Sequence, residues 1–157
     1  SWTHPDPSEL DRKIRDVLQF HKVNLVLLAG YVKKIGPLVL REFQNRILNI
    51  HPGLLPAFGG KGMYGLRVHE AVIASGARIS GVTIHLVNEE YDQGAIIAQE
   101  VLKVDPEDTP ESLSQKVLEI EHWFFPKVIR LFAKGMVKIK DRNVKFSNEC
   151  EELEVDS

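Results

Sequence analysis

Hydrophobic residues recur at two different spacings along the first half of the chain. Residues 9–21 carry them at helical spacing after a potential cap at Ser8, which predicts a helix. Residues 23–29 form a nearly continuous apolar run, typical of a strand buried on both faces. A second helix over 38–43 follows a proline, and 46–50 predicts another buried strand. This alternation of helix and strand is typical of an α/β fold.

The second half begins with a loop over 51–65, and long loops without secondary structure are often functional. The later pattern predicts, in order, a helix over 66–75 ended by Gly76, strands over 79–87 and 94–104, a helix over 110–134 that starts after Thr109, and a hairpin over 136–146. We expect one domain over 1–157, whose acidic tail at 148–157 is disordered.

Composition narrows the classes of protein to consider. Hydrophobic residues make up 43% and charged residues 27% of the 157 residues, so a packed core is expected. A net charge of −2 gives no basic surplus for nucleic acid. The apolar runs are too short for a membrane span, and no Cys or His set has metal-site spacing. The single cysteine and the lack of a signal-peptide pattern favour a cytoplasmic protein.

The end of the second predicted strand carries two candidate catalytic residues. Asn49 and His51 lie two positions apart, so their side chains point to the same side of the strand. An Asn amide can stabilise an oxyanion, and His transfers protons near neutral pH. The alternative is a polar pair that only bonds a neighbouring loop, and the two residues alone favour that alternative.

Asp92 follows the strand predicted over 79–87 and is a third candidate. Its carboxylate could accept a hydrogen bond from His51 and hold one tautomer of the ring. The alternative is an aspartate that caps its own turn ahead of Gly94, which turn statistics favour for an isolated residue.

Several blocks together resemble the glycinamide ribonucleotide formyltransferase family. The matching blocks, in the order of the family, are 28–31, 49–56, 81–87, 91–97 and the Glu121-His122 pair ahead of Phe125-Pro126. The loop over 58–65 is similar to that of a bacterial branch of the family. The resemblance implies a mostly parallel, Rossmann-like formyltransferase sheet flanked by helices, with a C-terminal helix and hairpin.

The same resemblance implies an activity. The family transfers a formyl group from 10-formyltetrahydrofolate to the amine of glycinamide ribonucleotide in purine biosynthesis, with Asn49, His51 and Asp92 at the catalytic positions. Asn49 and a protonated His51 would stabilise the formyl oxygen, while the charge of Asp92 would raise the pKa of His51. The folate is a consumed co-substrate, and the chemistry needs no metal.

The resemblance also implies binding residues. Glu121 and Pro52 would contact the ribonucleotide. The folate would be lined by Val32, Lys33, Lys34, Ile35, Val87, Asn88 and Glu89. Lys33 and Lys34 depart from the family, which often has Arg and a more apolar residue there. His85 and His69 are assigned to packing.

The family normally begins with an additional strand, phosphate-binding turn and helix, which this sequence lacks. Their absence would leave an apolar edge and face exposed beside the strand at 23–29. We therefore expect a homodimer or a separate N-terminal half. Two other functions remain open: a hydrolase that deformylates 10-formyltetrahydrofolate, and a catalytically inactive folate-binding or assembly fragment.

Overall fold

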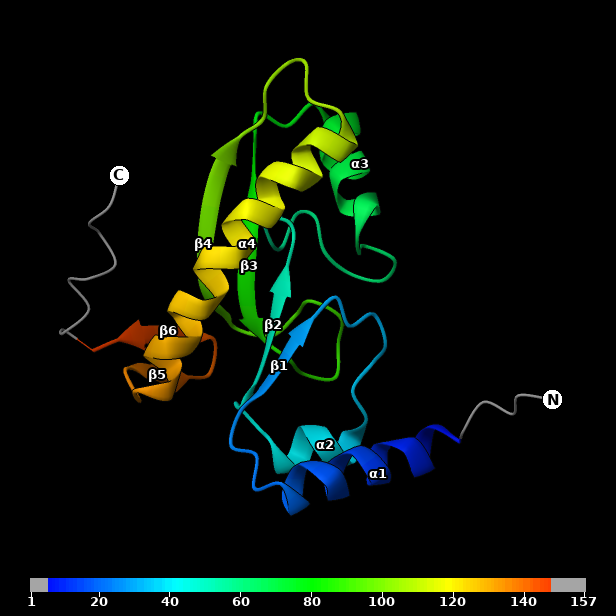
Figure 1. The fold of residues 1–157 in the computed structure, drawn as a ribbon, viewed down its shortest axis with the longest axis vertical. Helices are drawn as coiled ribbons and strands as arrows, with labels where there is room; N and C mark the ends of the chain where they lie inside the picture. The colour runs from blue at the N-terminus through cyan, green and yellow to red at the C-terminus, as the bar shows by residue number, and fades with distance from the viewer. Residues whose placement is uncertain (1–5, 148–157) are drawn as a thin grey trace.

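The computed structural model describes residues 6–147, which form a four-stranded sheet, a two-stranded hairpin and four helices (Figure 1). The predicted acidic tail at 148–157 lies outside the described residues. In chain order the elements are α1 (Pro7–Phe20), β1 (Val26–Ala29), α2 (Pro37–Glu42), β2 (Ile47–His51), α3 (Leu66–Ser75), β3 (Ile79–Leu86), β4 (Ile96–Lys103), α4 (Pro110–Ala133), β5 (Val137–Lys140) and β6 (Asn143–Phe146).

The α/β class and the predicted elements are confirmed. The larger sheet has the order β1-β2-β3-β4. It is mixed over the described residues: β1 and β2 are parallel, whereas β2 pairs with β3 and β3 with β4 in antiparallel fashion. The second sheet is the expected C-terminal hairpin of β5 and β6. No helix among residues 6–147 is long and apolar enough to cross a membrane.

The apolar run at 23–29 predicted burial of β1 on both faces, which is wrong, whereas the expected exposure of an apolar edge and face beside this strand is confirmed. Val26 and Leu28 pack against the small core of Val39, Phe43 and Ile47. Leu27, on the other face, is 42% exposed. Because β1 pairs only with β2 among the described strands, its outer edge is also unpaired. The apolar run therefore correctly predicted a strand, but burial of its second face requires an element that the described residues do not supply.

Helix ends follow the local chemistry, with one correction. The cap of α1 is Asp6, whose side chain accepts from the Ser8 N–H, rather than Ser8 itself. Pro7 then occupies the first helical position, where a missing N–H costs nothing. Thr109 caps α4 as predicted, through a reciprocal pair of hydrogen bonds with Ser112.

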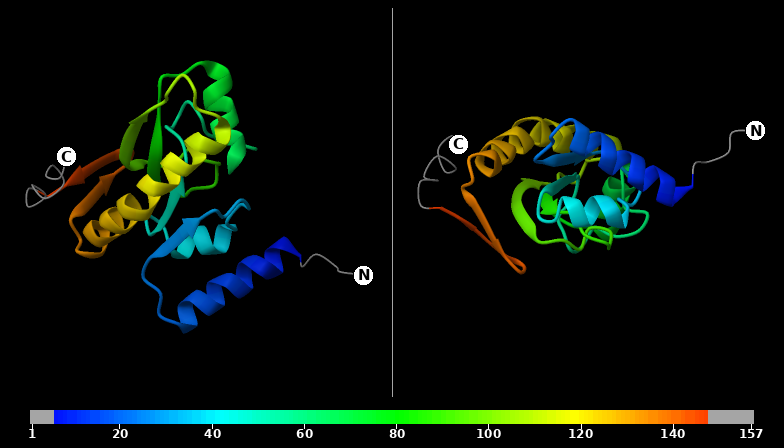
Figure 2. Two further views of the ribbon diagram at one scale, coloured as in Figure 1. Left: turned by 45° about the horizontal axis from the view of Figure 1, so that its top comes forward. Right: turned by 90° about the horizontal axis from the view of Figure 1, so that it is seen from below.

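The four helices form two pairs that pack at different parts of the sheet. Helix α4 crosses β3 and β4 and packs on α3, as the views of Figure 1 and Figure 2 agree. Helices α1 and α2 pack on each other at the β1 end of the molecule. The main core combines β2, β3, β4 and α4, and includes Leu48, Ile84 and Val117. This arrangement brings the ends of β1 and β2 close to the loop before α3.

A buried aspartate joins the two N-terminal helices. Asp11 of α1 is 4% exposed and accepts hydrogen bonds from the N–H groups of Leu38 at 2.8 Å and Val39 at 3.2 Å. These N–H groups open α2, whose own cap residue, Gly36, has no side chain to bond them. Asp11 therefore caps a helix that is distant in sequence.

Asp11→Ala is expected to lower the free energy of unfolding by about 2 kcal/mol, since it removes two bonds and leaves N–H groups of α2 without their acceptor. Urea denaturation followed by circular dichroism measures the loss. Asp16→Ala is the matched control, because Asp16 is exposed on the same helix and bonds only its neighbour Arg15. Equal stability of the two variants would contradict the capping role.

Candidate active site

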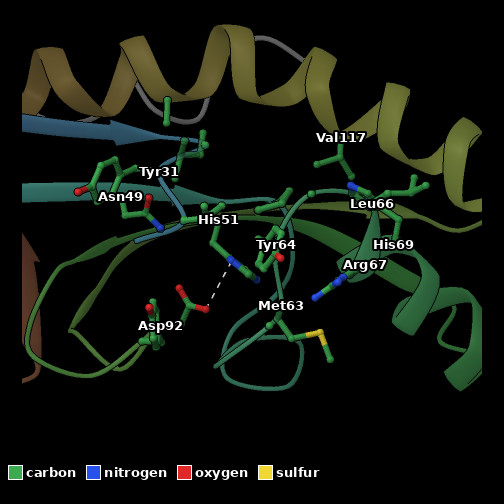
Figure 3. Close-up of a pocket in the computed structure, with 18 of the residues that line it drawn as sticks. Tyr31, Asn49, His51, Met63, Tyr64, Leu66, Arg67, His69, Asp92 and Val117 are labelled. Carbon is green, nitrogen blue, oxygen red and sulfur yellow. Dashed lines mark ion pairs between the residues drawn. The ribbon is translucent and has the colours of Figure 1, made fainter. Parts of the chain in front are cut away.

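A cavity of about 690 Å³ opens where β1, β2 and α4 meet the loop before α3 (Figure 3). Asn49, His51 and Asp92 all line it. The three predicted catalytic residues are therefore brought together from two segments that are about 40 positions apart in the sequence. The prediction that the side chains of Asn49 and His51 point to the same side of the strand is also confirmed, since both face the cavity.

His51 is held by the loop that follows it. The residue is 3% exposed, and Nε2 lies 2.6 Å from the backbone carbonyl oxygen of Phe58. A carbonyl oxygen can only accept, so Nε2 carries a proton and donates it. In the neutral ring Nδ1 is then the basic nitrogen, and it faces the Asp92 carboxylate at 3.7 Å.

Asp92 is positioned by its backbone and by the same loop. Its φ of 55° lies in the left-handed region, which Asp tolerates better than most residues. The Gly60 N–H donates to Oδ2 at 2.9 Å. Burial opposes the charge, but His85 beside the carboxylate, the Gly60 N–H and His51 lower the pKa of Asp92 overall. The carboxylate is thus kept ionised beside His51.

The pKa of His51 contradicts the expectation from the sequence. Desolvation by burial lowers it below the usual value and outweighs the opposite effects of Asp92 and of the Phe58 carbonyl. Asp92 does act in the predicted direction, but it is the smaller influence. A lowered pKa favours the neutral ring, which can accept a proton.

His85 was assigned to packing, but it orients a catalytic residue. Its Nδ1 lies 2.9 Å from the Leu86 carbonyl oxygen, so this nitrogen donates. In the neutral ring Nε2 then accepts from the Asn49 amide at 3.1 Å. One amide hydrogen of Asn49 is thereby fixed, and the other is left for a ligand. The same Nε2 lies 3.4 Å from Asp92 Oδ1.

The loop over 58–60 contacts both members of the His51–Asp92 pair. The Phe58 carbonyl accepts from His51, while the Gly60 N–H donates to Asp92. Between them, a Cβ at Gly59 would displace the end of the Leu55 side chain and crowd Asp92. The glycine at this position allows the loop to approach the pair closely.

The predicted folate residues are divided in the structure. Val32 lines the cavity. Ile35 and Val87 are partly buried against the small core of Val39, Phe43 and Ile47. The other four are exposed and lie outside the cavity: Lys33, Lys34, Asn88 and Glu89. The Lys34 ammonium lies 5.1 Å from the ring centre of Tyr91, which itself lines the cavity.

The two residues predicted to contact the ribonucleotide, Pro52 and Glu121, both line the cavity. Burial raises the pKa of Glu121, against a smaller opposite effect of His122. Glu121 therefore lines the cavity from α4, and its carboxyl group is protonated more readily than that of an exposed glutamate.

The cavity also includes polar and charged side chains that were not proposed from the sequence as part of the site, among them Lys61, Tyr64, Arg67 and His69. The sequence had indicated only that the loop over 51–65, which contains Lys61 and Tyr64, was functional, and it had assigned His69 to packing. Figure 3 shows Arg67 and His69 at one end of the cavity, with Asn49 and Tyr31 at the other and His51 between them. Within residues 6–147, no group of three or more His, Cys, Asp or Glu side chains could hold a metal ion.

Comparison with known proteins agrees with this geometry. The formyl transferase family pattern matches residues 3–129. The chain belongs to the formyl transferase family. It is 51% identical over 138 residues, 88% of the chain, to the chloroplastic phosphoribosylglycinamide formyltransferase of Arabidopsis thaliana. This confirms the family indicated by the sequence blocks.

Solved structures are similar as well. Glycinamide ribonucleotide transformylase 1 from Symbiobacterium toebii matches 92% of this chain with a TM-score of 0.85 and 39% identity. A formyltetrahydrofolate deformylase from Pseudomonas syringae matches 91% with a TM-score of 0.80 and 25% identity. The chain spans 46% of the Arabidopsis protein and 66% of the Symbiobacterium structure.

Proposed function

We propose that this formyltransferase transfers the formyl group of 10-formyltetrahydrofolate to the amine of glycinamide ribonucleotide, as a step of purine biosynthesis. The convergence of Asn49, His51 and Asp92 on one cavity carries the proposal. Family membership and the names of the similar proteins support this substrate pair. Cytoplasmic localisation stays a prediction, since the Arabidopsis protein is named as chloroplastic.

Asn49 stabilises the oxyanion in this mechanism. The amine attacks the formyl carbon, a carbon–nitrogen bond forms, and negative charge develops on the formyl oxygen. One amide hydrogen of Asn49 is held by His85, so the second can donate to that oxygen. A fixed donor needs no reorganisation as the charge develops, which is why it favours the transition state.

His51 and Asp92 transfer the proton of the attacking amine in this mechanism. His51 is neutral, and its Nδ1 can accept the proton that the attacking amine releases, directly or through a water molecule. The imidazolium that results is stabilised by Asp92 Oδ2, 3.7 Å away. The proton is then delivered to the folate nitrogen as its bond to the formyl carbon breaks, which yields tetrahydrofolate and the formylated amine.

The substrates occupy the cavity from two sides in this proposal. Glu121 and Pro52 contact the ribonucleotide, and both line the cavity. The folate is held by the segment that includes Val32 and by the loop before Asp92. No metal takes part in these steps.

We also propose that the free edge of β1 pairs with a further strand, from a separate N-terminal half or a second copy of the chain. The edge is unpaired among the described strands, and Leu27 and Val32 are 42% and 50% exposed. Light scattering of the purified chain tests this: a concentration-independent monomer that binds no N-terminal fragment of a relative would contradict it.

A transfer assay with the purified chain tests the activity. The chain is mixed with 10-formyltetrahydrofolate and glycinamide ribonucleotide, and both products are followed. Formylated ribonucleotide that forms only when both substrates are present is the expected result. Folate binding without any product would favour the inactive fragment.

A hydrolase is the second candidate, because a formyltetrahydrofolate deformylase is among the similar structures. It would use water as the acceptor with the same three residues. Release of free formate at an equal rate with and without the ribonucleotide would identify this activity and reject the transferase.

A further inference from the structure

Beside the catalytic residues, the cavity has an end formed by the start of α3, the preceding loop and two basic side chains. We propose that this end is an oxyanion subsite, which binds the phosphate or a carboxylate of a substrate through the N-terminus of α3, Arg67, Lys61 and His69. The inference deepens the proposed function, on which its choice of ligands rests.

The N-terminus of α3 supplies free donors. The helix runs for 10 residues from Leu66, and its cap residue, Gly65, has no side chain to bond the first N–H groups. Leu66 and Arg67, whose N–H groups open the helix, both line the cavity. Uncapped N–H groups and the helix dipole together favour an anion at such a position.

His69 gives an independent indication of a ligand. It is 2% exposed, it lines the cavity, and its Nδ1 is inaccessible and without a hydrogen-bond partner. Since an orphaned buried N–H is rarely tolerated, the proton of the neutral ring belongs on Nε2. Burial, and to a lesser degree His51, lowers the pKa of His69, which keeps the ring neutral. His69 thus has one N–H to offer, and no partner within the described residues accepts it.

Two cations complete the subsite. Arg67 and Lys61 line the same cavity, and neither forms an ion pair with a carboxylate among residues 6–147. The Arg67 guanidinium lies 5.0 Å from the ring centre of Tyr64, which holds it near the loop. Guanidinium groups bind phosphates and carboxylates in bidentate fashion.

The position of the subsite suits a substrate with one reacting end and one anionic end. Figure 3 places Arg67 and His69 on one side of His51, and Asn49 on the other. A ligand whose reacting group lies at Asn49 and His51 can therefore extend its charge toward α3. Both proposed substrates have this form: the ribonucleotide carries a phosphate, and the folate carries glutamate carboxylates.

Arg67→Gln tests the subsite by calorimetric binding to the purified chain. Two ligand pairs separate the sources of the anion: glycinamide ribonucleotide against its dephosphorylated riboside, and folic acid against pteroic acid, which lacks glutamate. We expect Arg67→Gln to bind one charged ligand about five- to tenfold more weakly than the unsubstituted chain does. The less charged member of the same ligand pair should bind less than twofold more weakly. A loss for the ribonucleotide identifies the phosphate, and a loss for folic acid identifies the carboxylates.

Arg78→Gln is the matched control, since Arg78 is exposed beyond the other end of α3 and outside the cavity. His69→Phe, which keeps an aromatic ring but removes the donor, should show the same ligand selectivity as Arg67→Gln. Unchanged binding of both charged ligands in Arg67→Gln, equal losses within each pair, or no binding of either charged ligand by the unsubstituted chain would overturn the subsite. A chain that binds with this selectivity but transfers no formyl group would instead contradict only the proposed activity.

Discussion

Asp92→Asn is expected to lower the rate of formyl transfer by about 10³-fold, because it removes the charge that stabilises protonated His51. The substitution is nearly isosteric. The Asn oxygen can still accept from the Gly60 N–H, which Asp92 Oδ2 now does at 2.9 Å. The loop should therefore keep its conformation, and the loss should appear in kcat rather than in folding.

Two measurements check this prediction. Steady-state kinetics give the loss of kcat, with Glu90→Gln as the control, because Glu90 is an exposed acid in the same loop. Titration by NMR should show the pKa of His51 falling further below its usual value, since Asp92 is the main influence that raises it. A variant with kcat within tenfold of the unsubstituted chain, or an unchanged His51 titration, would reject the role of Asp92.

Asn49→Ala is expected to lower kcat by about 10²- to 10³-fold, the usual result of removing one donor from an oxyanion site. The amide is held at 3.1 Å from His85 Nε2, so it is oriented before the substrate arrives. Since the donor acts on charge that develops in the transition state, KM should change much less than kcat.

Asn24→Ala is the control for this substitution, because Asn24 is exposed and its side chain lies outside the cavity. Equal losses in kcat and in ligand affinity would show that Asn49 binds the ground state and does not stabilise the oxyanion.

Local signals in the sequence were sufficient for most of the fold. Helix α3 begins and ends at the predicted residues, because Gly76 supplies the left-handed cap, with φ of 70°. Thr109 and Pro110 likewise begin α4. The cap of α1 was assigned two residues too late, to Ser8 in place of Asp6, since both residue types cap helices and only the backbone distinguishes them.

The candidate site was predicted in part. The alternation of side chains along a strand is a local property, so it placed Asn49 and His51 on one side. The binding residues were carried over from the family blocks. Among them Pro52, Glu121 and Val32 line the cavity, while Lys33 and Asn88 are exposed outside it.

The sequence by itself determined the order of helices and strands, the family, and the identity of Asn49 and His51 as neighbours on one strand face. Only the tertiary structure decided the partners and the charge of these residues. The antiparallel register places His85 opposite Asn49. Burial lowers the pKa of His51 despite Asp92. Hydrogen-bond partners across strands and desolvation depend on contacts between segments distant in sequence, which no local pattern encodes.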